Sequence, residues 1–389
     1  MSEEDLGYSF FFEAGRRELG LADLPVARVI SESRGAYRVK NENGEYLAKI
    51  TGGQMFRARS REDYPAVGDW VAITELNDGH ALIRGILPRR TVIKRRYGDR
   101  NKAGEKDEVQ VIAANIDVAF IVESVDRDYS LNRLERYFAI AESGGVKPAI
   151  VLNKTDLLSG EELAGILAEI RKRFPAADII PTSTATDAGL KELRERINKS
   201  RTYCFLGSSG VGKSSLINKL LQTSEIKTGD ISSYSGRGKH ITTRRQMYFL
   251  PGDPDATAPT SRPEVGVGTG AGPDAAVGAG GMVIDNPGIR EVGMTDVNRG
   301  IDTVFKEIAA LAKECRYADC THTHEPGCKV LAAARSGKLD EGKYLNYIEL
   351  KKEAEYYEMN SAEKREKDRG FGKFLKQAKK ELGKSGRKN

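Results

Sequence analysis

The sequence has few cysteines and no long apolar run, and both absences limit what kind of protein it can be. Four cysteines in 389 residues are too few for a disulfide-stabilised secreted scaffold. No segment approaches the roughly 20 consecutive apolar residues of a membrane-spanning helix, and residues 1–10 are acidic where a signal peptide would be basic. We therefore expect a cytoplasmic protein without a membrane partner.

The net charge is small, but it is unevenly distributed along the chain. Residues 84–106 hold nine basic and two acidic side chains, or +7, and residues 361–389 hold eleven and four, again +7. Because the whole chain carries +6, the remainder carries −8. Two basic segments on an acidic body favour a polyanionic partner such as nucleic acid, although a basic tail taken alone can simply be solvated.

A first domain is indicated by residues 27–88, which contain five short apolar segments separated by turn sequences such as NENG at 41–44. Five short strands predict a small closed β-barrel of the OB type, a fold that commonly binds oligonucleotides. A purely structural β domain is the alternative, because fold alone does not determine function. The basic segment that follows favours binding.

Residues 109–292 instead alternate apolar strands with amphipathic helices. Strands are expected at 116–124 and 148–153, and helices at 131–143 and 161–174. This alternation predicts a parallel sheet with helices on both faces. Residues 252–281 interrupt it with eight Gly, six Ala and four Pro, a composition that predicts a flexible insertion.

These patterns predict an N-terminal OB-type β-barrel, a central α/β domain and a C-terminal α-helical domain. A chain of 389 residues is long enough for two to three domains. The predicted parts are an N-terminal extension at 1–24, the barrel at 25–100, the α/β domain at 101–296 and the helical domain with its basic tail at 297–389.

A phosphate-binding motif stands between an expected strand and an expected helix. The motif GSSGVGKS at 207–214 follows TYCFL and leads into SSLINKLL, the context that a P-loop needs. Its glycines let backbone N–H groups surround phosphate oxygens at a helix N-terminus. We expect Lys213 to reach the β- and γ-phosphates and Ser214 to ligate Mg²⁺. The predicted GTP-binding residues here are Gly207, Ser208, Ser209, Gly210, Val211, Gly212, Lys213, Ser214 and Ser215.

Two further motifs specify the nucleotide. NKTD at 153–156 follows an apolar strand, and the Asp156 carboxylate can accept hydrogen bonds from the N1–H and 2-amino groups of guanine. Adenine offers neither donor, so the motif predicts GTP. The predicted residues at the base are Asn153, Lys154, Asp156, Ser183 and Thr184. After the strand at 282–285, Asp285 is expected to hold Mg²⁺ through water and the Gly288 N–H to contact the γ-phosphate.

The order of these motifs is unusual for a GTPase. Ordinary GTPases begin with the P-loop, whereas here NKTD comes first and DNPG at 285–288 comes last. The order predicts a circularly permuted domain, which is tolerated where the original termini lie close together. Nucleotide state is then placed to affect the C-terminal domain that follows DNPG.

A metal site is predicted near the C-terminus. Cys315, Cys320, His322 and Cys328 offer three thiolates and one imidazole, a ligand set suited to one structural, tetrahedral Zn²⁺. His324 is an alternative ligand. The fourth cysteine, Cys204, lies in an apolar segment and is expected in the core.

Together these motifs resemble the ribosome small subunit-dependent GTPase A family. VGDW at 67–70, LPRR at 87–90, GRGKHITT at 236–243 and the cysteine-rich segment carry the resemblance, which extends over nearly all of the chain from about residue 25. It implies a GTPase that binds the small ribosomal subunit and its rRNA late in maturation. Subunit-stimulated hydrolysis of GTP to GDP and phosphate would then precede release. We expect a monomer.

The resemblance also assigns switch residues. It matches the family's switch segment to GKHITT at 238–243, where His240 would position the attacking water and either Thr242 or Thr243 would ligate Mg²⁺. A surface or RNA-facing role for His240 is the alternative. Ile289 stands where Ras-like enzymes have a water-orienting Gln, so intrinsic hydrolysis should be slow. The catalytic residues expected are His240, Lys213, Thr242 and Thr243.

The chain departs from the family pattern at several positions. Asn286 stands where Thr or Ser is usual, Lys239 where Arg is usual, and Ile241 where a Thr is usual. A rival function is that of a nucleotide-gated RNA-binding module in which hydrolysis is incidental.

Overall fold

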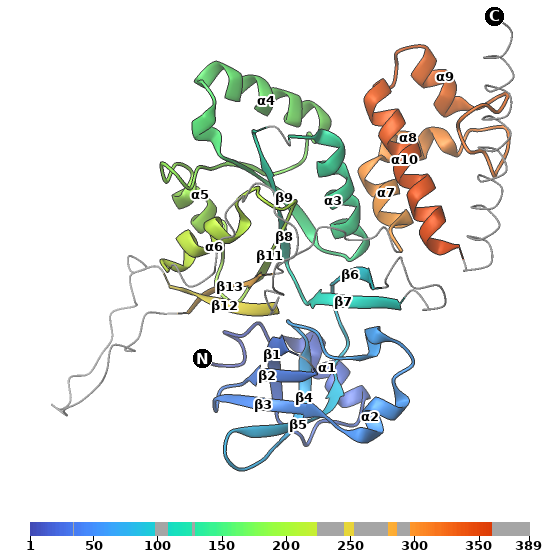
Figure 1. Cartoon of the computed structure of the whole chain (residues 1–389). Helices are drawn as coiled ribbons and strands as arrows, with labels where there is room; N and C mark the ends of the chain where they lie inside the picture. The colour runs from blue at the N-terminus through green and yellow to red at the C-terminus, as the bar shows by residue number, and fades with distance from the viewer. Residues whose placement is uncertain are drawn as a thin grey trace, which may run out of the picture.

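The computed structural model describes residues 1–33, 35–97, 108–126, 129–223, 245–252, 279–285 and 296–359. Along the chain it has a β-barrel, an α/β part and a helical C-terminal part with a Cys/His cluster, which confirms the predicted fold class (Figure 1). The domain boundaries stay predictions. Most of the predicted insertion at 252–281 and the basic tail at 361–389 lie outside the described residues.

The barrel closes on itself through five strands. They are β1 (Val26–Ser33), β2 (Ala36–Lys40), β3 (Glu45–Ile50), β4 (Trp70–Glu75) and β5 (His80–Ile86). Pairing runs β1-β2-β3-β5-β4, and β4 returns to β1. Alternate residues point inward, so Val29, Val39, Ile73 and Ile83 fill the interior. Two short helices, α2 (Gly52–Arg57) and η1 (Arg61–Asp63), connect β3 with β4.

The N-terminal extension is structured. Its helix α1 (Phe10–Glu18) buries Phe12 against Trp70, with ring centroids 6.0 Å apart, and Tyr8 packs edge-on to the same indole at 4.7 Å. No helix is predicted here from the sequence. Tertiary burial of aromatic side chains therefore explains the helix better than local pattern does.

The α/β part is built on six strands in the order β10-β9-β8-β11-β13-β12. These are β8 (Val118–Ser124), β9 (Lys147–Asn153), β10 (Ile179–Pro181), β11 (Thr202–Leu206), β12 (Arg245–Pro251) and β13 (Ala279–Asp285). All pairs in it are parallel except β12 with β13. The carboxyl ends of the five parallel strands therefore share one edge.

Helices cover both faces of this sheet. They are α3 (Leu131–Ser143), α4 (Gly160–Arg173), α5 (Leu190–Glu195) and α6 (Lys213–Leu221), with a short η2 (Thr155–Leu157). Ile121 packs in one core cluster with residues of α3 and α4, whereas its neighbour Phe120 packs with residues of α5 and α6. This alternation is the pattern predicted for a doubly covered sheet.

Two strand pairs join the barrel to the α/β part. β12 pairs with β1, with Ser31 opposite Gln246, so barrel and central sheet form one continuous eleven-stranded sheet. β6 (Val92–Tyr97) and β7 (Glu108–Ala114) form a separate antiparallel pair. Residues 92–97 stand out in the sequence only as part of a basic segment, so strand β6 is a finding of the structure.

The C-terminal part consists of α7 (Asn298–Val304), α8 (Lys306–Ala312), α9 (Lys329–Arg335) and α10 (Glu341–Glu358). It packs beside α3 (Figure 1). The contact between α7 and α3 is close, because a Cβ on Gly300 would lie 1.9 Å from the Ala139 carbonyl oxygen. None of the helices in the described ranges combines the length and apolarity that a bilayer span requires.

Candidate functional site

The phosphate loop connects the end of β11 to the start of α6. Gly207, Gly210 and Gly212 have φ angles of +149°, +86° and +98°, a region that other residues rarely adopt. A Cβ on Gly207 would lie 2.3 Å from the Val122 carbonyl oxygen, and one on Gly212 would lie 2.2 Å from Asn153 Nδ2. Both conformation and space therefore require glycine at these two positions.

Lys213 is folded back onto this loop. Its Nζ donates hydrogen bonds to the carbonyl oxygens of Gly207 at 2.8 Å and Ser208 at 2.6 Å. Burial lowers the pKa of Lys213 to about 8, and the charge of Asp285 opposes that shift. Burial likewise raises the pKa of Asp285, against the effect of Lys213. A cation and a carboxylate thus share a poorly solvated site beside the loop.

The donor set at this site suits Mg²⁺. Asp285, 8% exposed at the end of β13, offers carboxylate oxygens, and Ser214 offers a half-buried hydroxyl at the start of α6. Hard oxygen ligands of this kind are the ones that Mg²⁺ takes beside phosphates. The residues present therefore fit the ion that the motifs predict.

Asn153 joins the predicted base site to the phosphate loop. Its Nδ2 donates to the Val211 carbonyl oxygen at 2.8 Å, and its Oδ1 accepts from the Thr182 hydroxyl at 3.2 Å. Its side chain is completely buried. Because Asn153 ends β9 and Thr182 follows β10, the ends of two adjacent strands and the loop form one hydrogen-bonded unit.

Asp156 and Ser183 also meet, although 27 residues separate them in sequence. The Ser183 hydroxyl donates to the Asp156 carboxylate, while its oxygen accepts from the backbone N–H groups of Ala185 at 3.1 Å and Thr186 at 3.2 Å. These bonds orient the carboxylate. Thr184 lies next to Ser183 in the same loop and is half-buried.

Asp126, which belongs to none of the predicted motifs, forms an ion pair with Lys154 of NKTD. Lys154 adopts φ +64°, and its Nζ lies 2.6 Å from the Asp126 carboxylate. Asp126 follows the end of β8, and an acidic residue at the carboxyl end of a parallel strand is the signal that could have identified it. The predicted residues His240, Thr242, Thr243 and Gly288 lie outside the described residues.

Part of the basic segment at 84–106 is used within the molecule. Arg89 pairs with the buried Asp69 at 2.8 Å, and Arg90 pairs with Asp117 at 2.7 Å. Lys94 lies 2.8 Å from the Glu62 carboxylate. The segment therefore offers a partner less free charge than its composition suggests.

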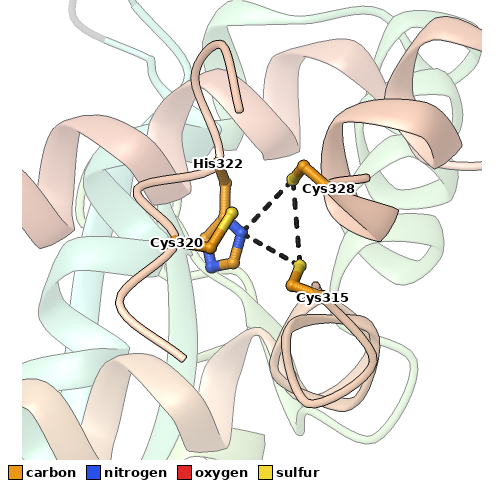
Figure 2. Close-up of side chains that lie close together, drawn as sticks. All are labelled: Cys315, Cys320, His322 and Cys328. Atoms are coloured by element: carbon orange, nitrogen blue, oxygen red, sulfur yellow. Dashed lines mark hydrogen bonds between the residues drawn. The ribbon is translucent and has the colours of Figure 1, made fainter. Parts of the chain in front are cut away.

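Near the C-terminus, the four predicted metal ligands converge (Figure 2). The Sγ atoms of Cys315 and Cys328 lie 3.8 Å apart, and His322 Nδ1 lies 3.6 and 3.5 Å from them. A tetrahedral Zn²⁺ with bonds of about 2.3 Å to sulfur and about 2.0 Å to nitrogen needs S···S and S···N separations of about 3.8 and 3.5 Å. All four ligand atoms, including that of Cys320, lie within 4.8 Å of one another, so the cluster could hold a metal ion.

Local structure fixes these ligands. Cys328 caps α9, since its Sγ accepts from the Leu331 N–H at 3.3 Å. His322 adopts φ +61°, and its carbonyl oxygen accepts a 2.7 Å hydrogen bond from the Tyr344 hydroxyl of α10. His324, the alternative ligand, is exposed and hydrogen-bonds Thr323 instead. The structure therefore gathers His322 and not His324 with the cysteines.

Comparisons with known proteins agree with this geometry. The model of a family described as RsgA GTPase matches residues 86–255. The small ribosomal subunit biogenesis GTPase RsgA 1 of Bacteroides thetaiotaomicron is 35% identical over 92% of this chain and 91% of its own. The RsgA protein of Opitutus terrae is 36% identical over 92% and 90%.

Solved structures share the fold. YjeQ from Thermotoga maritima aligns with a TM-score of 0.57 at 24% identity, over 84% of this chain and 96% of its own. YloQ, described as a circularly permuted GTPase, aligns with a TM-score of 0.54 at 20% identity, over 87% and 97%. Among these two, YloQ is thus a solved counterpart for a permuted order of motifs.

Proposed function

The chain belongs to the RsgA family of small ribosomal subunit biogenesis GTPases, and from that premise we propose that it acts on the small subunit and its rRNA during late maturation. The subunit would stimulate hydrolysis of GTP to GDP and phosphate, and the protein would then leave. The observation that carries the GTP-binding part of the proposal is the hydrogen bond from Asn153 to Val211, which joins the proposed guanine-reading motif to the phosphate loop.

In this proposal each described residue has a task. Asp156, oriented by Ser183, accepts hydrogen bonds from guanine, and Asn153 keeps the base site in register with the loop. Lys213 must exchange its two loop carbonyls for phosphate oxygens when GTP enters. Ser214 and Asp285 would hold Mg²⁺, which supplies positive charge to the phosphates when bound. The remaining members of the loop, Ser208, Ser209, Gly210 and Ser215, and Lys154 and Thr184 at the base, complete the proposed GTP site.

The switch residues are proposed from the sequence. His240 would position the attacking water and Thr242 or Thr243 would complete the Mg²⁺ site, while the Gly288 N–H would contact the γ-phosphate. Ile289 has no group that could orient water, so His240 has to contribute. We expect His240→Ala to reduce subunit-stimulated turnover by about 10²-fold or more, while GTP affinity changes little.

We also propose that the Cys/His cluster holds one structural Zn²⁺, that the protein is a monomer and that it resides in the cytoplasm. The cluster's separations match tetrahedral zinc, and its ligands link the loop after α8 to α9. Other basic residues of 84–106, with those of the tail, would contact rRNA phosphates.

The proposal is tested by comparing purified small and large ribosomal subunits as stimulators of GTP turnover. We expect a sharp rise with small subunits only, and its loss in Lys213→Ala. Lys191→Ala removes an exposed lysine from α5 and is the matched control, which should behave as the unmodified protein. Equal stimulation by both subunits would rule out the small-subunit assignment, and an active Lys213→Ala would rule out the phosphate site.

A further inference from the structure

An arginine of α3 contacts the phosphate loop from outside the nucleotide motifs. The Arg133 guanidinium donates through one terminal nitrogen to the Ser208 hydroxyl at 3.1 Å and through the other to Glu123 Oε1 at 3.0 Å. Ser208 is the second residue of the loop, and Glu123 lies near the end of β8. One planar side chain therefore connects a helix, a strand and the loop.

The carboxylate that holds Arg133 is completely buried, whereas the arginine side chain is 26% exposed. Removing a buried carboxylate from water is costly unless a cation remains beside it, so Glu123 holds the guanidinium at this place. The remaining terminal nitrogen is then directed at Ser208. A fork of fixed geometry makes this two-way contact, which a lysine cannot reproduce.

Ser208 is held from two sides. Arg133 binds its hydroxyl, while Lys213 Nζ binds its carbonyl oxygen at 2.6 Å. Tyr137, one helical turn after Arg133, also contacts the Ser208 side chain. When Lys213 leaves the carbonyl to bind phosphate, the contacts from α3 are the ones that keep this end of the loop in place.

The position of α3 is in turn set by the C-terminal helices. Arg136 pairs with Glu353 of α10 at 2.7 Å, and the Gly300 N–H of α7 donates to Ser143 Oγ at 3.1 Å. Neither contact involves a residue of the nucleotide motifs. The frame from which Arg133 reaches the loop is thus independent of the nucleotide.

We propose that Arg133 is a positioning residue for GTP hydrolysis, acting through Ser208 to hold the phosphate loop in its phosphate-binding form. A loop whose N–H groups are already aligned need not reorganise when charge develops on the phosphates. The proposal rests on the GTPase function proposed above, and it adds a residue that none of the nucleotide motifs contains.

The test is a double-mutant cycle on Arg133→Ala and Ser208→Ala, read by the dissociation rate of a fluorescent GDP analogue and by kcat for GTP. Each single variant should speed dissociation and lower kcat by about tenfold, since one charge-assisted hydrogen bond is lost. The double variant should be no worse than either, because both remove the same contact. Arg133→Lys should recover only part of the loss.

Arg171→Ala is the matched control, because it removes an exposed guanidinium from helix α4, away from the phosphate loop contacts of α3. It should change both readouts by less than about twofold and should combine additively with Ser208→Ala. Thermal unfolding of every variant separates loop positioning from loss of folded protein.

Wild-type rates in Arg133→Ala, or additivity between Arg133→Ala and Ser208→Ala, would overturn the proposal. Loss of activity that tracks only a lower melting temperature would do the same. Failure of the unmodified protein to hydrolyse GTP would contradict the proposed function instead. The dissociation rate would still decide whether Arg133 positions the loop.

Discussion

At the scale of single residues, a serine hydroxyl determines which way the proposed base-reading carboxylate points. Ser183 is fully buried and donates to Asp156, while two backbone N–H groups hold its oxygen. The hydroxyl proton is thereby committed to Asp156. The opposite side of the carboxylate is left to accept the N1–H and amino groups of guanine.

Asp156→Asn should change nucleotide preference from GTP to XTP. An amide cannot accept both hydrogen bonds that guanine donates, but its N–H₂ can donate to the 2-oxo group of xanthine. We expect GTP affinity to fall by about 10²-fold or more, since hydrogen bonds to a charged group are worth about 1.5–3 kcal/mol each. Equilibrium binding of labelled GTP and XTP measures the change.

Ser183→Ala is the matched control for this exchange. It leaves the carboxylate in place but removes the group that orients it. GTP affinity should fall by about tenfold, with no gain for XTP. An Asp156→Asn protein that still prefers GTP would contradict the role given to Asp156.

The predicted site residues that the structure describes lie close together because each stands at or just after the carboxyl end of a strand in one parallel sheet. That placement can be predicted from the residues next to it in the sequence. Asn153, Ser183, Gly207 and Asp285 all share it. Arg133 could not be found in this way. Its contact with Ser208 spans 75 residues and depends on how α3 lies against the sheet.

At the scale of elements, the strands and helices predicted at 116–124, 131–143, 148–153 and 161–174 are confirmed within a few residues. The spacing of the apolar residues in each element predicts which face of that element is buried. The sequence pattern predicts neither β6 nor α1, and the physical reason differs between the two. The sequence VIKRRY in β6 is too basic to read as a strand, and α1 is a nine-residue helix that depends on the barrel surface to bury Phe12.

The contribution of the contact between α3 and α7 to stability can be tested by adding one methyl group at Gly300. A Cβ on Gly300 would lie 1.9 Å from the Ala139 carbonyl oxygen and 2.2 Å from Ser143 Oγ. Gly300→Ala should therefore force α7 away from α3 and lower the free energy of unfolding by about 2–3 kcal/mol. Chemical denaturation followed by circular dichroism measures the loss.

Gly165→Ala is the control, because a Cβ there, on the exposed side of α4, meets no atom within 4 Å. The same substitution should stabilise the protein by about 0.5–1 kcal/mol through helix propensity. If both variants changed the free energy of unfolding in the same direction, the close packing of α7 on α3 would not be a determinant of the fold.

At the scale of the whole molecule, the Cys/His cluster joins helices of the C-terminal part, and a buried arginine joins the barrel to the α/β part. We expect one Zn²⁺ per chain, and its loss in Cys320→Ser or His322→Ala, because three ligands do not close a structural site. Elemental analysis of the purified protein gives the stoichiometry. Removing zinc with a chelator should unfold the C-terminal helices at a lower temperature.

Two neighbouring substitutions separate this prediction from general damage. His324→Ala removes the exposed alternative histidine, and Cys204→Ala removes a cysteine buried in β11. Both proteins should keep one zinc per chain. If zinc were retained in His322→Ala but lost in His324→Ala, the zinc ligand would be His324 and not His322.

Arg28 links the N-terminal extension, the barrel and the α/β part. It is 1% exposed on β1, and its guanidinium donates to carbonyl oxygens of Leu6, Gly68 and Asn115 and to the Thr202 hydroxyl. Burial lowers the pKa of Arg28 to about 10, so it stays charged at neutral pH. No local pattern marks it, since it stands in an apolar strand where a core residue is expected.

Arg28→Met should therefore loosen the barrel from the central sheet. It keeps an aliphatic chain in the space, and the Gly68 carbonyl oxygen still accepts from Asn115 Nδ2. The other three acceptors lose their donor in a buried region, at a cost of about 1–3 kcal/mol for each one that water cannot reach. We expect the free energy of unfolding to fall by about 3–5 kcal/mol in total and protease to release the barrel first. Arg38→Met, at an arginine 58% exposed on β2, should change it by less than about 0.5 kcal/mol. If the two variants unfolded alike, the Arg28 guanidinium would have no part in holding the barrel to the central sheet.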